Sequence, residues 1–296
     1  MNNHLKFIQD NDFENFKNNF PKRFNAHILE MIMKYNRMNF LEVYTKNFTQ
    51  IFKFGCLRGN LEVIKFAVEK GCNIHIYKDK YALHNTIRPN HVQIVKYLLD
   101  NFEYDQKSIN KCYEKSWRYK ELLEYLDDKF IINLSQTTFG EMFKRSCLFA
   151  TEGSVALYLI NHKNIKIEDI KRGFLNAVHT KKFEMSEYIL TKFQIDLNLI
   201  KDGIIELCQN FMYSGEMEAF NYLISKSEDS IVFIESKKEE LFIGLCKRGS
   251  KKIIEYLLNN FELSKEVIEE GIVQSSHWGL ISISLLLFDF LIDKFN

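Results

Sequence analysis

The sequence contains few residues that break helices. Its 296 residues include only two prolines, Pro21 and Pro89, and twelve glycines. No stretch rich in proline, glycine or serine separates one part of the chain from another. Proline and glycine are the residues least tolerated inside helices, whereas leucine, lysine and glutamate favour them. The composition therefore predicts an all-α chain.

The sequence also lacks an excess of charge of either sign. Forty basic side chains nearly balance thirty-nine acidic ones, which leaves a formal net charge of +1. A protein that binds nucleic acid or an anionic membrane presents a basic patch, but the lysine clusters here are interspersed with glutamates. We therefore expect no nucleic-acid partner and no membrane partner.

Long hydrophobic runs are missing as well. The most apolar stretch, residues 280–288, contains two serines and stops at Asp289, whereas a helix that spans a bilayer needs about 20 apolar residues. The first residues, MNNHLKFIQDND, are polar and do not resemble the apolar core of a secretory signal. These features predict a cytoplasmic protein, located in the host cytoplasm if the chain is encoded by a virus.

Motifs for metal or covalent chemistry are absent from the sequence. The six cysteines form no CxxC pair, which predicts reduced and mostly buried thiols. His84 and His91 are separated by the turn at Pro89 and have no third ligand at a zinc-like spacing, so His84 is interpreted as a structural hydrogen-bonding residue. No nucleotide-binding loop, zinc-protease motif or nucleophile elbow occurs. We expect no catalytic residue, no cofactor and no metal, and hence no enzyme.

What the sequence does contain is a repeat. An aromatic residue followed by aliphatic residues recurs at intervals of 28 to 34 residues. These aromatic anchors are Phe66, Tyr97, Tyr125, Tyr158, Tyr188, Tyr222, Tyr256 and Phe290. The interval is typical of a helix-turn-helix unit stacked into a solenoid. Because the anchors recur at the apolar phase of each unit, we expect them to lie in the core.

Each anchor lies in a predicted second helix, and a predicted first helix precedes it by about ten residues. The clearest second helix spans 92–99, and the clearest first helices span 51–57, 173–179 and 240–246. Gly59, Gly215 and Gly249 each stand seven residues before an anchor, in the turn between the two helices. Glycine at that place permits the left-handed backbone with which many helices end.

The stretch YALHNTIRPNHVQIVKYLL, residues 81–99, resembles an ankyrin repeat. Ala82-Leu83-His84 falls on the Pro-Leu-His of the family's first helix, and Asn90-His91 falls on its usual Gly-His turn. Residues 55–74 resemble the same pattern and end in Gly71-Cys72-Asn73-Ile74. This resemblance, to divergent ankyrin-repeat proteins of the kind found in amoebae or large DNA viruses, implies an ankyrin-like solenoid of about eight repeats over 49–296.

The ends of the second helices depart from the ankyrin pattern. The glycine that usually ends this helix survives only as Gly71. Five residues after an anchor stand Phe102, Phe130, Phe193, Phe261 and Phe295. Because phenylalanine resists the left-handed conformation, we expect these helices to end differently or to run on.

Residues 1–48 do not fit the repeat. Two amphipathic helices are predicted over 20–36 and 38–48, and we interpret them as an N-terminal helical cap, since end repeats need a polar outer face. An alternative interpretation compares Phe20-Pro21 and the apolar residues after it with an F-box. The chain would then be a substrate-recruiting adaptor of a ubiquitin ligase. An enzyme in an unusual helical fold is the third hypothesis, and no motif supports it.

The repeat architecture implies a non-enzymatic scaffold that binds a protein partner of unknown identity through a concave face of first helices and loop tips. By register, the residues that face the partner lie twelve, nine and eight positions before an anchor. Trp117 and Arg118 are added because tryptophan and arginine are enriched in binding hot spots. The expected protein-binding residues are Phe54, Leu57, Arg58, Asn85, Arg88, Trp117, Arg118, Asn176, His179, Thr180, Lys247 and Arg248. We expect a monomer, with Trp278 helping to cap the last unit.

Overall fold

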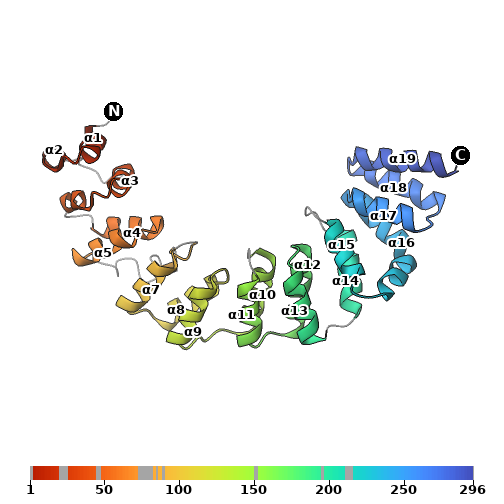
Figure 1. Ribbon diagram of the computed structural model, residues 1–296, viewed down its shortest axis with the longest axis horizontal. Coiled ribbons are helices and arrows are strands. Elements are labelled where there is room, and N and C mark those ends of the chain that lie inside the picture. The colour runs from red at the N-terminus through yellow and green to blue at the C-terminus, as the bar shows by residue number, and fades with distance from the viewer. Residues whose placement is uncertain are drawn as a thin grey trace. The chain divides into compact units, whose positions relative to one another are not determined.

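The computed structural model describes residues 3–19, 26–44, 48–72, 83–84, 86–88, 91–149, 153–194, 197–210 and 216–295. Every regular element in these ranges is a helix, which confirms the predicted all-α class (Figure 1). The chain divides into two compact units, which we call unit 1, Met1–Leu134, and unit 2, Ser135–Asn296. The boundary predicted at residue 48 falls within unit 1.

Unit 1 begins with short helices that contact one another, α1 with α2 and α3, and the 3-10 helix η1 with α2 and α3. Further along the unit, α4 packs on α5, and α9 packs on both α7 and α8. The elements are α1 (Asn3–Gln9), α2 (Phe13–Asn18), α3 (Ala26–Lys34), η1 (Met38–Val43), α4 (Phe48–Arg58), α5 (Leu61–Glu69), α7 (Val92–Asn101), α8 (Gln106–Lys115) and α9 (Lys120–Lys129).

The helix predicted over 38–48 is wrong in its bounds and type. Met38–Val43 form a 3-10 helix, and α4 begins at Phe48. Phe40, Leu41 and Tyr44 are all buried. The three-residue turn of a 3-10 helix places Leu41 and Tyr44 above one another on one face, which an α-helix of the same length would not do as closely.

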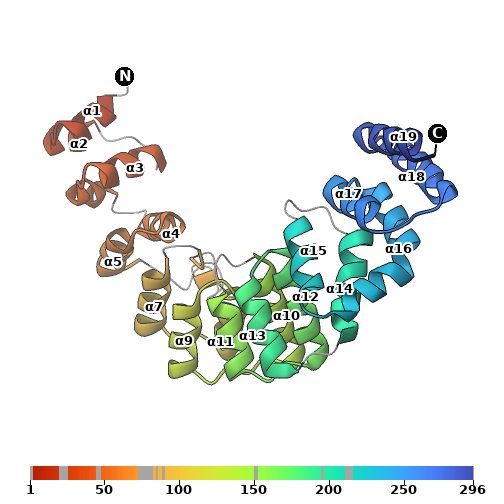
Figure 2. The same cartoon turned by 45° about the vertical axis from the view of Figure 1, so that its right-hand side comes forward.

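Unit 2 consists, in its described part, of consecutive helix pairs (Figures 1 and 2). The first helices α10, α12, α14, α16 and α18 contact one another in that order, and each packs on the second helix that follows it. The bounds are α10 (Gln136–Phe149), α11 (Ser154–His162), α12 (Ile167–His179), α13 (Phe183–Phe193), α14 (Leu197–Asn210), α15 (Glu216–Ile224), α16 (Asp229–Arg248), α17 (Lys251–Asn260), α18 (Lys265–His277) and α19 (Ile281–Phe295).

Seven of the repeats bury the same three positions of their second helix. They are the residues three before, two before and one after the anchor. These are Val63, Ile64 and Ala67; Ile94, Val95 and Leu98; Leu122, Leu123 and Leu126; Val155, Ala156 and Leu159; Met185, Ser186 and Ile189; Ala219, Phe220 and Leu223; Ile253, Ile254 and Leu257. The anchors themselves were expected in the core, and this is wrong for all but Tyr158, because the others are only half-buried.

At five of the anchors, a lysine four residues later accounts for this half-exposure. The ammonium groups of Lys70, Lys129, Lys192, Lys226 and Lys294 lie 4.5–5.5 Å from the ring centroids of Phe66, Tyr125, Tyr188, Tyr222 and Phe290. An ammonium ion is attracted to the face of an aromatic ring but needs water around its other side. The ring therefore lies at the rim of the core, with one face toward the apolar residues and the other toward lysine.

The phase of the turns is confirmed by backbone angles. Gly59 and Gly249 have φ of 74° and 86°, and Lys181 occupies the same place before Tyr188 with φ of 60°. Gly215 lies outside the described residues. In the last pair the left-handed glycine is Gly279, with φ of 72°, and seven residues later stands Leu286. The repeat phase of α19 therefore falls on Leu286, one turn before the predicted anchor Phe290.

Three of the second helices, α7, α9 and α17, end as their phenylalanines require. Phe102, Phe130 and Phe261 follow the last helical residue with an extended backbone, at φ between −137° and −131°. The rings of Phe102 and Phe261 pack edge-on against their own anchors Tyr97 and Tyr256, with centroids 6.4 and 6.2 Å apart. The expectation that these helices end without a left-handed cap is confirmed at these three positions.

Candidate protein-binding groove

Unit 2 carries a groove of about 500 Å³ along its first helices. Gln209 comes from α14, Ile243, Gly244 and Lys247 from α16, and Val267 from α18. Glu239, Glu240, Arg248, Glu270 and Trp278 complete the lining. We call this hollow the first-helix groove. It lies on the helix layer that the repeat pattern predicted for partner binding.

Gly244 allows α14 and α16 to lie close together at the groove. A Cβ at this position would lie 3.0 Å from the backbone oxygen of Cys208 in α14. Cβ contacts of this length are rarely tolerated, so a side chain here would push α14 and α16 apart. The bare glycine lets the two helices approach and leaves apolar side chains, Ile243 and Val267, on either side.

Trp278 stands at the edge of the groove, directly after α18. Its backbone N–H donates to the carbonyl of Gln274, 3.3 Å away, and its indole is 63% exposed. Trp278 was expected to help cap the last repeat, and it is the C-cap residue of α18, with most of its indole open to solvent. An exposed tryptophan at a groove edge combines a large apolar face with an N–H donor, which is the type of side chain that dominates binding energy in protein interfaces.

The groove contains charges of both signs, and part of them hold the helices together. The Nε of Arg248 donates to the carbonyl oxygen of Gln209 across 2.8 Å, and the Gln209 amide donates to Glu240 Oε1 across 3.0 Å. Lys237 donates to the other oxygen of Glu240 at 3.1 Å. Arg248 therefore joins α16 to the end of α14. Lys247 and Glu270 are exposed, and we regard them as the charges that a partner can reach.

The other predicted residues of unit 2 are used inside the protein. Asn176 and His179 were expected to face a partner, but both are buried. The Asn176 amide donates to the carbonyl of Lys144 at 3.1 Å, and the Thr180 hydroxyl donates to the carbonyl of Cys147 at 3.1 Å. These bonds join α12 to α10. Asn176 lies on a first helix and Thr180 directly after it, as the repeat spacing predicted. Their side chains face the preceding first helix, α10, instead of a partner.

His179 is the most strongly perturbed of these residues. Burial lowers the pKa of its imidazole to about 4, and the nearby positive charge of Arg172 contributes in the same direction. The ring is therefore neutral at physiological pH. A neutral, enclosed imidazole serves packing between helices and is not placed to meet a partner.

The predicted residues of unit 1 form contacts of several kinds. Phe54 is buried, with the Arg58 guanidinium 5.6 Å from its ring centroid, and Arg58 also forms an ion pair with Glu30. Leu57 is half-buried and Arg88 is exposed. Asn85 lies outside the described residues.

Trp117 and Arg118 lie in the turn between α8 and α9, as predicted. The Arg118 guanidinium lies 4.4 Å from the Trp117 ring centroid. The tryptophan is half-buried and the arginine exposed, so an arginine stacked on an indole is presented to solvent at this turn.

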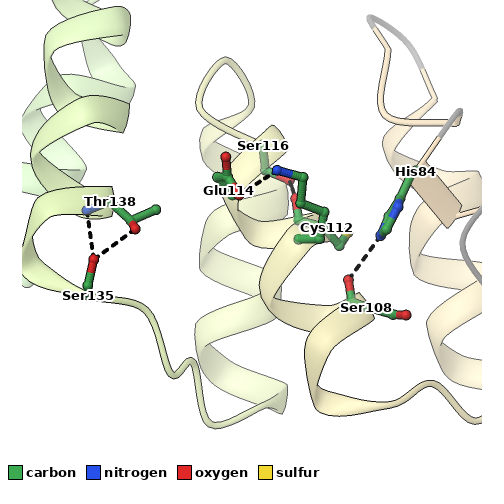
Figure 3. Close-up of polar contacts among 8 residues, drawn as sticks. His84, Ser108, Cys112, Glu114, Ser116, Ser135 and Thr138 are labelled. Carbon is green, nitrogen blue, oxygen red and sulfur yellow. Dashed lines mark hydrogen bonds and ion pairs between the residues drawn. The ribbon is translucent and has the colours of Figure 1, made fainter.

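A second hollow, of about 570 Å³, lies in unit 1 between His84, α8 and Leu134. Nε2 of His84 lies 3.3 Å from the carbonyl oxygen of Ser108, and Figure 3 shows the imidazole directed toward that oxygen. Lys111 pairs with Glu114 at 2.7 Å on the neighbouring turn. The prediction that His84 is a structural hydrogen-bonding residue is confirmed, because this contact joins His84 to α8 in the next repeat of unit 1.

The cysteines are free thiols, and five of the six are buried. Burial raises the pKa of Cys56, Cys112, Cys147, Cys208 and Cys246 to about 12. A thiol with such a pKa is almost entirely protonated at neutral pH, and the thiolate is the reactive form. These side chains therefore behave as small apolar packing residues, as the sequence predicted.

In the described ranges, no group of three or more histidine, cysteine, aspartate or glutamate side chains is arranged to hold a metal ion. No described helix is both long and apolar enough to cross a membrane. Comparisons with protein-family models, with curated proteins and with solved structures found no match. The groove and its neighbouring contacts are therefore the observations on which a function can be argued.

Sequence reasoning missed most of the groove. Lys247 and Arg248 were predicted, but Gly244, Val267 and Glu270 were not. The signal available for Gly244 was a glycine in the middle of a predicted first helix, which costs helix stability and indicates a close approach of another backbone.

Proposed function

We propose that this chain is a non-enzymatic, ankyrin-like repeat scaffold, and that the first-helix groove of unit 2 binds a protein partner. The likeness of residues 81–99 and 55–74 to ankyrin repeats supports the solenoid, as do the consecutive helix pairs of unit 2. The observation that carries the binding role is the groove itself, with exposed Trp278 beside exposed Lys247 and Glu270.

The composition of the groove defines the partner's chemistry. Trp278 and Val267 offer apolar surface, which favours a partner segment that inserts an apolar side chain. Lys247 lies on one first helix and Glu270 on the next. We therefore expect the partner segment to carry an acidic residue on one side of that apolar residue, to pair with Lys247, and a basic residue on the other side, to pair with Glu270.

Site-specific photo-crosslinking tests the proposal. Benzoylphenylalanine replaces Trp278 in one variant and Lys252, which is exposed on α17, in a matched control. After illumination in cytosolic extract, a discrete protein adduct is expected at position 278 and not at 252. Lys247→Glu should weaken that adduct, whereas Arg248 is left unchanged because it joins α16 to α14.

Two outcomes contradict the proposal. Adducts of equal yield at 278 and 252 would show contact without selectivity for the groove. A discrete adduct at 278 that Lys247→Glu leaves at full yield would show that the charge beside the tryptophan is not part of the binding surface. Circular dichroism of each variant provides the control for folding.

A further inference from the structure

Helix α19 is apolar on two opposite faces. One face, with Ile283 and Leu287 at 2% and 0% exposure, is buried in the packing with α18. On the opposite face lie Ile281, Leu285, Phe288, Ile292 and Phe295, which are 39–70% exposed. We call these five residues the α19 stripe. A helix that is apolar on two opposite faces is typical of one that packs against neighbours on both of them.

The stripe follows a regular spacing. Its residues are separated alternately by four and three positions, so that they share one face of the helix. This is the spacing with which two helices pack along a common seam. Single exposed apolar residues need no explanation, but a continuous line of five over the length of one helix does.

The stripe also lies at positions that, in other repeats, contact the second helix of the next repeat. Alignment of the left-handed glycines Gly249 and Gly279 sets Ile281 and Leu285 at the positions of Lys251 and Glu255 in α17. The position of Leu285 is the one directly before the anchor. In α13 that residue is Glu187, which forms an ion pair with Lys226, two residues after the end of the next second helix, α15.

The same relation holds in unit 1. Lys96, directly before the anchor Tyr97, lies 5.3 Å from the Tyr125 ring centroid and 2.7 Å from Glu121, both in the next second helix of its stack. The α19 stripe is therefore continuous with a helix–helix contact surface that other units use, and it carries apolar residues where those units carry charge.

We propose that a second copy of this chain covers the stripe, with the two α19 helices antiparallel about a twofold axis. A twofold axis brings the same patch of both copies together, and a line of apolar residues alone is complementary to itself. Five side chains of about 200 Å², roughly half exposed, present on the order of 500 Å² per copy. Two copies thus bury about 1,000 Å², which is about the lower limit for a specific interface.

The rim of the stripe carries charge on one side. Asp289 and Asp293 are exposed there together with Ser282, and the Lys294 ammonium lies 5.7 Å from the Phe295 ring centroid. The choice of occupant therefore rests on the self-complementarity of the stripe and on the area that two copies bury. The dimer differs from the monomer expected from the sequence, and it does not depend on the first-helix groove.

Light scattering after gel filtration, over the micromolar range, tests the dimer. The intact chain should show a mass near twice 35.2 kDa that declines on dilution. Leu285→Lys with Phe288→Lys should give the mass of one chain at every concentration. The matched control is Ile231→Lys with Val232→Lys, which changes two exposed apolar residues of α16 in the same way and should leave the dimer intact.

Two results would overturn the proposal. An intact chain with the mass of one copy over the whole range would assign the stripe to a different partner. A dimer that persists in the folded Leu285→Lys, Phe288→Lys variant would place the interface elsewhere. Circular dichroism establishes that both variants are folded.

Discussion

At the residue scale, backbone angles and burial decide how each repeated position is used. The turn residue seven positions before the anchor is left-handed at Gly59, Lys181 and Gly249. Glycine adopts that conformation without cost, whereas a residue with a Cβ is strained in it by about 1–2 kcal/mol. Lys181 adopts the left-handed conformation despite this strain. The packing of the two helices therefore determines the turn conformation even where the residue is not glycine.

Substitutions at this turn should have opposite effects. Gly59→Ala should lower the free energy of unfolding by about 1–2 kcal/mol or more, because φ is 74° and the new Cβ would meet His91 Nε2 at 2.1 Å. Lys181→Gly should be neutral or raise it by up to about 1 kcal/mol, since the lost ion pair with Glu218 is exposed. Urea denaturation measures both, and destabilisation by Lys181→Gly would contradict the argument.

His179 should make the stability of unit 2 dependent on pH. Its folded pKa of about 4 lies below the ordinary value of 6.5 because burial disfavours the charged ring. Above pH 6.5 the ring is neutral in the folded and the unfolded chain, so it does not reduce the free energy of unfolding. As the pH falls from 6.5 toward 4, the ring is protonated only in the unfolded chain, and the free energy of unfolding decreases by about 3 kcal/mol.

The measurement compares the intact chain with His179→Leu, by urea denaturation between pH 7 and 4. The variant should lose less stability on acidification, whatever its stability at pH 7. Parallel losses in the two proteins would show that His179 is not responsible.

At the element scale, close approach of helices is achieved with glycines on the first helices. Gly173 of α12 faces Phe143 of α10, and a Cβ there would lie 2.2 Å from the phenylalanine ring. Phe143 is fully buried, so its ring has no free space into which to move. Gly244 plays the comparable role between α16 and α14, where the approach of the helices also shapes the groove.

Gly173→Ala should therefore destabilise unit 2 by about 1–3 kcal/mol through overpacking between α10 and α12. The matched control is Gly153→Ala, where the new Cβ would meet Met185 Cβ at an ordinary 3.5 Å and φ is −63°. That variant should change stability by less than about 0.5 kcal/mol. Thermal unfolding of both proteins tests the pair, and equal effects would count against helix contact as the cause.

At the scale of the whole molecule, the chain is two compact units, and each has its own buried core. In repeat architectures most contacts join neighbouring units, so that stability is local rather than shared evenly along the chain. Leu126 in unit 1 and Ile189 in unit 2 occupy the same repeat position, one residue after an anchor, and both are fully buried.

Leu126→Ala and Ile189→Ala should each cost about 2–5 kcal/mol, in their own unit. Hydrogen exchange read by mass spectrometry should show faster exchange in α7–α9 for the first variant and in α10–α15 for the second. Faster exchange throughout both units in either variant would show that the chain unfolds as one cooperative body.

The sequence by itself determined what depends on local spacing. Few prolines, the apolar positions at helical intervals and the recurring anchors predicted the helices, their pairing and the left-handed turns at Gly59 and Gly249. These features arise from backbone conformation and from one helix's own periodicity, which neighbouring residues encode. The burial of the cysteines followed in the same way.

Only the tertiary structure decided which face of each helix is covered. His179 stands nine residues before its anchor, as exposed Arg88 and Lys247 do, yet His179 is buried. Five of the half-buried anchors, Phe66, Tyr125, Tyr188, Tyr222 and Phe290, have a lysine over the ring. The groove depends on how closely α14 and α16 approach at Gly244. The α19 stripe is exposed because no described helix packs on it. Exposure is a property of the neighbour as much as of the residue, and neighbours distant in sequence leave no trace in local periodicity.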